Sequence, residues 1–218
     1  MEAPGRRRLA MEAPAPPFDR NPSSWRQRVP IAALALGATG ISVYMGLYQW
    51  GLTDSVWDPV FGSGTETVLT SRESEIMGGV IGVPDAIFGA WAYLTEAVLS
   101  LAGSTRRWQF RPWLVLLFGL DVIPLGLVSV ALVIVQGASV GAWCFLCLVT
   151  ALISLVLIVL VYDEVWASIR YLRGIWARER DASLLWDAFI GRGSPRAYAV
   201  ALEMERWPEA RRRTEREA

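Results

Sequence analysis

The residues best suited to chemistry in this 218-residue chain are its two cysteines, Cys144 and Cys147. Their spacing places both sulfurs one helical turn apart on one face of a helix, close enough to form a disulfide. The aligned peptide dipoles at a helix N-terminus also stabilise a thiolate. The pair therefore indicates thiol–disulfide redox chemistry, with two buried small apolar side chains as the alternative interpretation.

The composition excludes two other classes of function. A structural zinc site needs four Cys or His ligands, but the chain has no His and no second pair of cysteines. We therefore expect no metal site. Lys+Arg and Asp+Glu number 21 each, so the net charge is zero and nothing indicates binding to nucleic acid.

The cysteines begin an apolar segment, residues 142–162, that is long enough to cross a bilayer, which takes about 20 helical residues. Three further segments have a similar length and character. With 53% hydrophobic residues, the chain has the composition of a polytopic membrane protein. We predict an all-α membrane protein, a bundle of four transmembrane helices with an outer loop capping the bundle mouth. The other three predicted helices are residues 30–50, 83–101 and 112–136.

The polar ends of the chain divide it into three parts. Residues 1–29 are rich in Pro and Arg and are predicted to be a disordered cytoplasmic segment. Residues 30–165 form the predicted transmembrane domain. Residues 166–218 are predicted to be a charged cytoplasmic tail, with an amphipathic helix near the membrane and a break at residues 191–195.

The positions of the arginines predict the orientation in the membrane. The long loop of residues 51–81 contains a single arginine, Arg72, and five acidic residues. The positive-inside rule then places both termini in the cytoplasm of a multi-pass protein of the inner or plasma membrane. The cysteine pair would lie on the outer side, where disulfides persist. The remaining arginines of the head, the second connection and the start of the tail are Arg6, Arg7, Arg8, Arg20, Arg26, Arg28, Arg106, Arg107, Arg111, Arg170 and Arg173.

Two stretches of sequence resemble the vitamin K epoxide reductase family, including its bacterial homologues. One is WCFLCLVTALISL, which is similar to the active-site helix of that family. The other is VLTSRESEIMGGVIGVPDAIFGAWAYL, which is similar to the segment that leads from the first loop into the second helix. With the spacing of the apolar segments, the resemblance covers about residues 30–165.

The resemblance implies oxidation of thiols coupled to reduction of a quinone, either menaquinone or ubiquinone. Cys147 would react with the quinone, and Cys144 would exchange with an external thiol or thioredoxin-like protein on the outer face. A quinone carbonyl needs a hydrogen-bond donor, and Ser71 or Ser74 is a candidate; a helix cap or turn is the competing role for these serines.

The chain departs from this family in its first loop, where members usually carry a second pair of cysteines that relays electrons. The corresponding positions fall near Thr65 and Trp57, and neither is a cysteine. An external thiol protein would then reduce the helix pair directly, or a partner would donate the missing pair. The third account is a non-catalytic membrane subunit or assembly factor that retains only the scaffold.

Three acidic residues have both a chemical and a structural interpretation. Asp58 follows Trp57 in the first loop, where it could act as an acid–base group over a quinone or cap a turn through backbone amides. Asp121 lies within the third apolar segment and suggests a proton relay or a hydrogen bond between helices. Glu96 lies near the cytoplasmic end of the second segment, where we expect it to reach the interface or to pair with Arg106 or Arg107.

Overall fold

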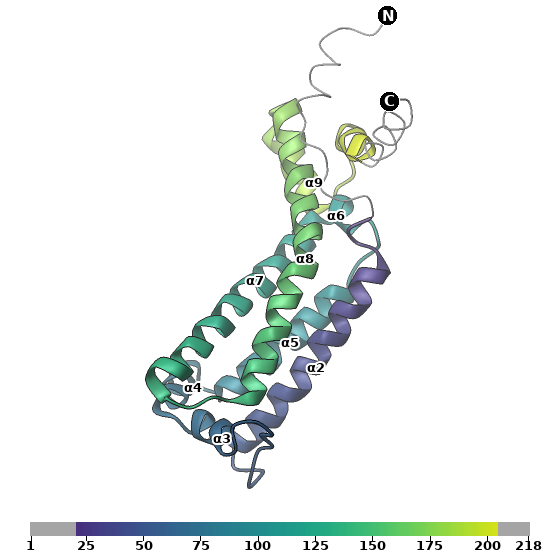
Figure 1. Cartoon of the computed structure of the whole chain (residues 1–218). Helices are drawn as coiled ribbons and strands as arrows, with labels where there is room; N and C mark the ends of the chain where they lie inside the picture. The colour runs from purple at the N-terminus through teal and green to yellow at the C-terminus, as the bar shows by residue number, and fades with distance from the viewer. Residues whose placement is uncertain (1–20, 205–218) are drawn as a thin grey trace, which may run out of the picture.

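The computed structural model describes residues 21–204 and consists of helices and connecting loops, with no strand among those residues. Four long helices pack side by side along the length of the molecule (Figure 1). Short helices lie at both ends of this bundle. The long helices are α2 (Trp25–Gln49), α5 (Asp85–Leu101), α7 (Pro112–Val135) and α8 (Phe145–Glu179); the short ones are α3 (Gly64–Leu69), α4 (Arg72–Ile81), α6 (Arg107–Phe110) and α9 (Ala182–Ile190).

Three of the long helices in residues 21–204 are long and apolar enough to cross a membrane. They are α2, α8, and α7 together with the π-helical turn that continues it, η1 (Gln136–Val140). Helix α5 is shorter, at 17 residues. The predicted all-helical architecture is confirmed for residues 21–204, with three of the four predicted transmembrane helices long and apolar enough to cross a membrane.

Two helices extend beyond the segments predicted for them. Helix α2 begins at Trp25, so residues 25–29 are helical and do not belong to a disordered segment; residues 1–20 lie outside the described part of the chain. Helix α8 does not end near residue 162 but runs on to Glu179, because a buried stripe continues along it without an intervening proline. Glu164, Ala167 and Tyr171 belong to that stripe.

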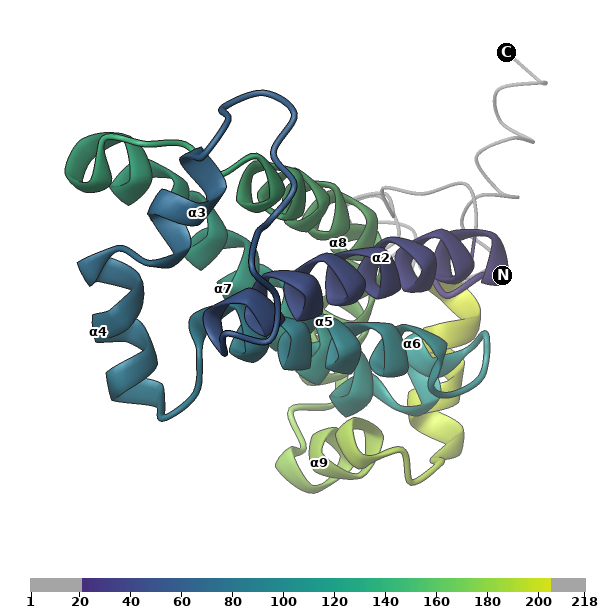
Figure 2. The same ribbon diagram turned by 90° about the horizontal axis from the view of Figure 1, so that it is seen from below.

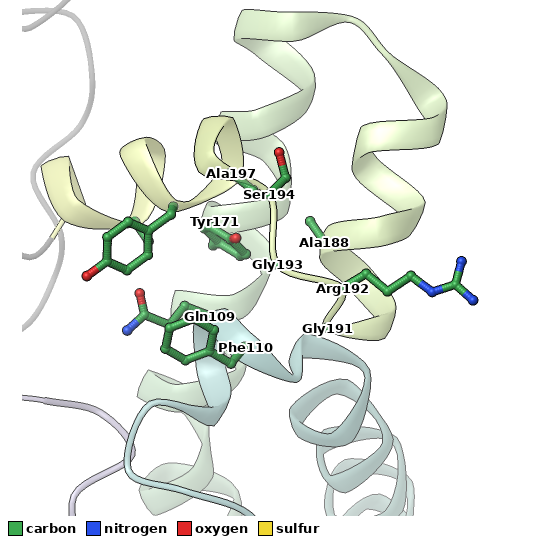
Figure 3. Close-up of a pocket in the computed structure, with 11 residues that line it drawn as sticks. Gln109, Phe110, Tyr171, Ala188, Gly191, Arg192, Gly193, Ser194 and Ala197 are labelled. Atoms are coloured by element: carbon green, nitrogen blue, oxygen red, sulfur yellow. The ribbon is translucent and has the colours of Figure 1, made fainter.

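The far end of α8 packs against α9 and the helical residues 195–204. The predicted break is confirmed at Gly191, which ends α9 with a φ of 86°, a left-handed conformation that favours glycine. A small pocket lies between these segments and α6, lined by residues that include Tyr171 and Ser194 (Figure 3). Its volume of about 20 Å³ is room for about one water molecule. We therefore do not treat it as a ligand site.

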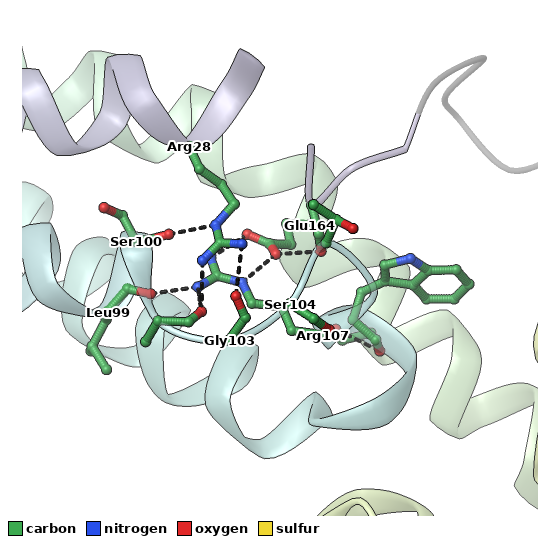
Figure 4. A network of polar contacts seen from close by, with 12 residues as sticks. Arg28, Leu99, Ser100, Gly103, Ser104, Arg107 and Glu164 are labelled. Carbon is green, nitrogen blue, oxygen red and sulfur yellow. Dashed lines mark hydrogen bonds and ion pairs between the residues drawn. The ribbon is translucent and has the colours of Figure 1, made fainter. Parts of the chain in front are cut away.

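A buried ion pair joins α6 to α8 at the end of the bundle opposite the cysteines (Figure 4). Arg107 Nε and Nη2 donate to the two carboxylate oxygens of Glu164 at 2.6 and 2.7 Å, and both side chains are fully buried. Ser23 Oγ donates to the same carboxylate at 2.5 Å. The expected pairing of Glu96 with Arg107 is therefore wrong, because both carboxylate oxygens of Glu164 bind this guanidinium.

A second buried arginine, Arg28 of α2, binds the backbone carbonyls that end α5. Its Nε donates to the carbonyl of Ser100 at 2.6 Å, and its Nη2 donates to that of Ala102 at 2.7 Å. These carbonyls have no hydrogen-bond partner within the helix, and a buried carbonyl without a partner costs free energy. The guanidinium of Arg28 supplies the missing hydrogen bonds.

Candidate redox site

The two cysteines form a disulfide at the N-terminus of α8, as the spacing predicts. Cys144 is the N-cap residue and Cys147 lies in the first turn, with their Cα atoms 5.2 Å apart. The backbone N–H of Cys147 donates to Cys144 Sγ at 3.0 Å. The N–H of Cys144 donates to Gln136 Oε1 at 3.1 Å, so the end of α7 also holds the pair in place.

The two sulfurs have different surroundings. Cys147 is half-buried, lies 3.7 Å from the sulfur of Met45, and lines a cavity of about 150 Å³. Cys144 is fully buried and is not among the residues that line this cavity. A group in the cavity can therefore approach only one cysteine of the pair.

Apolar side chains make up most of the cavity wall. They come from α2, α3, α5, α7 and α8, so the cavity lies within the bundle near the end where α3 and α4 are found (Figures 1 and 2). Met45, Val68, Phe88, Leu125, Val128 and Leu132 contribute to this wall. An apolar ligand is the class of molecule that such a surface favours.

One side of the cavity carries a polar cluster on α2, α4 and α5. Gln49 Nε2 donates to Ser74 Oγ at 2.8 Å and to Asp85 Oδ1 at 2.5 Å, and Ser74 Oγ donates to Asp85 Oδ1 at 3.0 Å. Ser71 lies beside them as the N-cap of α4 and accepts a hydrogen bond from the N–H of Ser74 at 3.3 Å. The structure thus brings both candidate serines to the cavity that Cys147 lines.

Further into the bundle, a second polar group lines the cavity. The hydroxyl of Tyr93 lies 2.7 Å from Ser154 Oγ and donates to the carbonyl of Thr150 at 3.3 Å. Ser129 Oγ lies 3.4 Å from Ser154 Oγ. Sequence reasoning predicted Asp85 only as an acidic residue at the start of a helix, and it assigned neither Asp85 nor Tyr93 nor Gln49 to the site. Asp85 and Tyr93 lie on α5, about two turns apart.

Asp58 lies in the loop outside this cavity and binds the backbone around it. Its carboxylate accepts from the N–H groups of Val60, Phe61 and Thr65 at 3.0, 2.7 and 3.1 Å, and from the Thr65 hydroxyl at 2.6 Å. Desolvation raises the pKa of Asp58, but the hydrogen bonds from Thr65, Phe61 and Val60 outweigh it and lower the pKa from 3.8 to about 2. These contacts are those of a residue that caps a turn.

The two loop positions where relay cysteines were expected lie against the residue next to Cys144. The N–H of Phe145 donates to Thr65 Oγ1 at 3.1 Å, and Thr65 is fully buried. The ring of Trp57 meets the ring of Phe145 edge-on, with centroids 5.8 Å apart. The loop therefore contacts the head of α8 without supplying a sulfur.

Comparison with known protein families shows to which family this chain belongs. The model of the vitamin K epoxide reductase family matches residues 29–162, more than half of the sequence. The chain belongs to the vitamin K epoxide reductase family. No curated protein and no solved structure matched it.

The part of the chain that matches the vitamin K epoxide reductase family contains every feature of the candidate site. It includes the loop with Asp58 and Thr65, the polar cluster around Ser74, and both cysteines. The extension of α8 beyond residue 162 and the helix α9 lie outside it. Residues 21–204 contain no group of three or more His, Cys, Asp or Glu side chains that could hold a metal ion.

Proposed function

We propose that this protein is a membrane thiol:quinone oxidoreductase that passes electrons from an external thiol through Cys144 and Cys147 to a quinone. The observation that carries the proposal is the difference between the two sulfurs. Cys147 lines an apolar cavity, whereas Cys144 lies outside it, beside the loop. One sulfur can thus face a lipophilic oxidant while the other is exchanged with a protein thiol.

The reaction balances as a two-electron exchange. Oxidation of Cys144 and Cys147 from the dithiol to the disulfide forms one S–S bond and releases two electrons and two protons. The two electrons, together with two protons, convert the quinone to the quinol. An external thiol or thioredoxin-like protein then reduces the disulfide again by exchange at Cys144, which is fully buried and becomes accessible when the first loop moves off the head of α8.

The cavity fits the ring of a quinone better than a polar substrate, because apolar walls surround a few polar groups. Ser71 and Ser74 are our candidates for hydrogen bonds to a quinone carbonyl. Menaquinone and ubiquinone both meet these requirements. Asp58 binds the loop amides, so we assign it to holding the loop over the head of α8 rather than to the quinone itself.

We further propose that α5 is the fourth transmembrane helix and that both termini face the cytoplasm of an inner or plasma membrane. The arginine distribution supports this orientation. Arg28 and Arg107 lie at the end of the bundle away from the cysteines. In this orientation the disulfide, the loop and the thiol partner share the outer face, where the loop caps the bundle mouth.

The test measures the redox state of the two cysteines in membranes. Reduced protein is incubated with quinone, and free thiols are then tagged with a maleimide of known mass. We expect the thiols to become protected when quinone is present, and Cys144→Ser and Cys147→Ser to abolish thiol-dependent quinone reduction. Ser63→Ala, an exposed loop change, is the control. Unchanged turnover in both cysteine variants would refute the mechanism.

One observation favours a second candidate function, a non-catalytic membrane subunit or assembly factor. Thr65 and Trp57 stand where the relay cysteines were expected, and both contact Phe145. This candidate predicts that serine at Cys144 and Cys147 has no effect in cells. Changes at Trp57, which is exposed, would instead disrupt a complex with a partner.

A further inference from the structure

Two carboxylic acids lie inside the bundle, away from the cysteines. Glu96 of α5 is only 1% exposed, and Asp121 lies on α7. Their chain neighbours Ala97 and Val122 belong to one buried cluster, so the two carboxyls lie in the same part of the bundle. Glu96 Oε2 and Asp121 Oδ2 are buried and have no hydrogen-bond partner among the described residues. The proposed reaction between the cysteines and the quinone leaves both groups without a role.

The neighbouring cations are engaged elsewhere. Arg107 of α6 forms its ion pair with Glu164 of α8, and Arg28 of α2 binds the carbonyls at the end of α5. A carboxylate with an unpaired buried oxygen is costly inside a membrane, and two adjacent carboxyls cannot both ionise cheaply. The pair of Glu96 and Asp121 therefore holds at least one proton.

Hydroxyl groups lie between this pair and the cavity beside Cys147. Tyr93 precedes Glu96 by three residues on α5, so the two side chains lie on one face of that helix. Asp121 and Ser129 are eight residues apart on α7, with Leu125 between them. Tyr93 and Ser129 both line the cavity and both contact Ser154 Oγ, at 2.7 and 3.4 Å.

We propose that Glu96 and Asp121 form a proton-binding site within the membrane that supplies protons to the quinone cavity through Tyr93 and the hydroxyls of Ser129 and Ser154. The supply of protons to the quinone depends on the proposed quinone reduction. The binding of a proton by Glu96 and Asp121 does not depend on it. One of the two protons that convert quinone to quinol comes from this site, and the other comes from the thiols. The second thiol proton leaves to water on the outer side, and water on the cytoplasmic side protonates the site again.

The first test needs no activity. Dicyclohexylcarbodiimide modifies protonated carboxyls within membranes, and mass spectrometry locates the modified residue in the full-length protein in lipid nanodiscs at neutral pH. We expect modification at Glu96 or Asp121, and its loss in the double variant Glu96→Gln/Asp121→Asn. Glu164 is equally buried but paired with Arg107, so it is the matched control and should remain unmodified. A folded protein with neither carboxyl modified overturns the proton site.

The second test follows a single turnover after reduced protein is mixed with a soluble quinone. We expect Glu96→Gln/Asp121→Asn to slow quinol formation by about 10²-fold, while dithiothreitol reduces the disulfide at the wild-type rate. Thr95→Ala, an exposed neighbour on α5, should match the wild type. Quinol formation at the wild-type rate in the double variant overturns the proton supply alone. A wild-type protein that does not reduce quinone overturns the proposed function, while the modification experiment still decides whether the site binds a proton.

Discussion

The backbone N–H of Phe145 donates a hydrogen bond of 3.1 Å to the hydroxyl of Thr65, and this contact joins the first loop to the head of the cysteine helix. Phe145 directly follows Cys144 in the chain, and Thr65 is fully buried. A threonine thus lies where the resemblance led us to expect a relay cysteine, next to the head of the cysteine helix.

This contact predicts that one substitution can supply one cysteine of the missing pair. In Thr65→Cys we expect the new thiol to form a disulfide with Cys144 under mild oxidation, because the two positions are adjacent and enclosed. Mass spectrometry of peptides from the non-reduced protein identifies the link. Thr67→Cys, on the exposed side of the same short helix, is the control and should not form it. If the two variants link to Cys144 equally, the geometry of the loop is not as described.

The carboxylate of Asp58 predicts that the loop loosens in acid. Its pKa is about 2 in the folded protein and 3.8 ordinarily, so its contribution to stability is fully present well above pH 3.8. That contribution is lost as the pH falls through the folded value. Hydrogen exchange of residues 58–65 should therefore lose protection between about pH 4 and pH 2.

Matched variants assign this effect to Asp58. Asp58→Asn should show low protection of the loop at every pH, because the amide cannot replace the charged acceptor of four hydrogen bonds. Asp54→Asn, an exposed change in the same loop, should behave like the wild type. Equal exchange in all three proteins would show that the loop is held by other contacts.

The buried pair of Arg107 and Glu164 predicts a large loss of stability when one partner is neutralised. Glu164→Gln leaves the guanidinium buried without its counter-charge, which costs about 3–5 kcal/mol. The free energy of unfolding, measured by denaturant titration in detergent, reports the change.

An exposed ion pair elsewhere in the chain is the control for this measurement. Arg178 and Glu203 also form an ion pair, but their side chains are 46% and 63% exposed. Glu203→Gln should therefore change the free energy of unfolding by no more than about 1 kcal/mol. A Glu164→Gln protein as stable as Glu203→Gln would contradict the buried arrangement.

The close approach of α2 and α5 predicts which glycines of α2 tolerate a methyl group. A Cβ at Gly46 would lie 2.3 Å from Cδ1 of Ile87, whereas a Cβ at Gly37 would meet nothing within 4 Å. We expect Gly46→Ala to lower the free energy of unfolding by about 1–3 kcal/mol and Gly37→Ala to leave it unchanged or raise it. Thermal unfolding in detergent distinguishes the two, and a stable Gly46→Ala protein would contradict the packing.

Many structural features of this protein can be predicted from short stretches of its sequence. Long apolar segments predict the long helices because a backbone in lipid must satisfy its own hydrogen bonds, and a helix does so within one segment. The spacing of Cys144 and Cys147 predicts a disulfide because four consecutive residues set the distance between the sulfurs. The sequence alone also shows that the loop positions Thr65 and Trp57, where we expected relay cysteines, carry no sulfur.

Only the tertiary structure decided which side chains meet. Arg107 pairs with Glu164 rather than Glu96, and these residues are 57 positions apart in the chain. Thr65 and Phe145, 80 positions apart, meet only because the loop folds onto the head of α8. Helical periodicity determines which face of a helix a residue occupies, but the packing of whole helices determines the partner on that face.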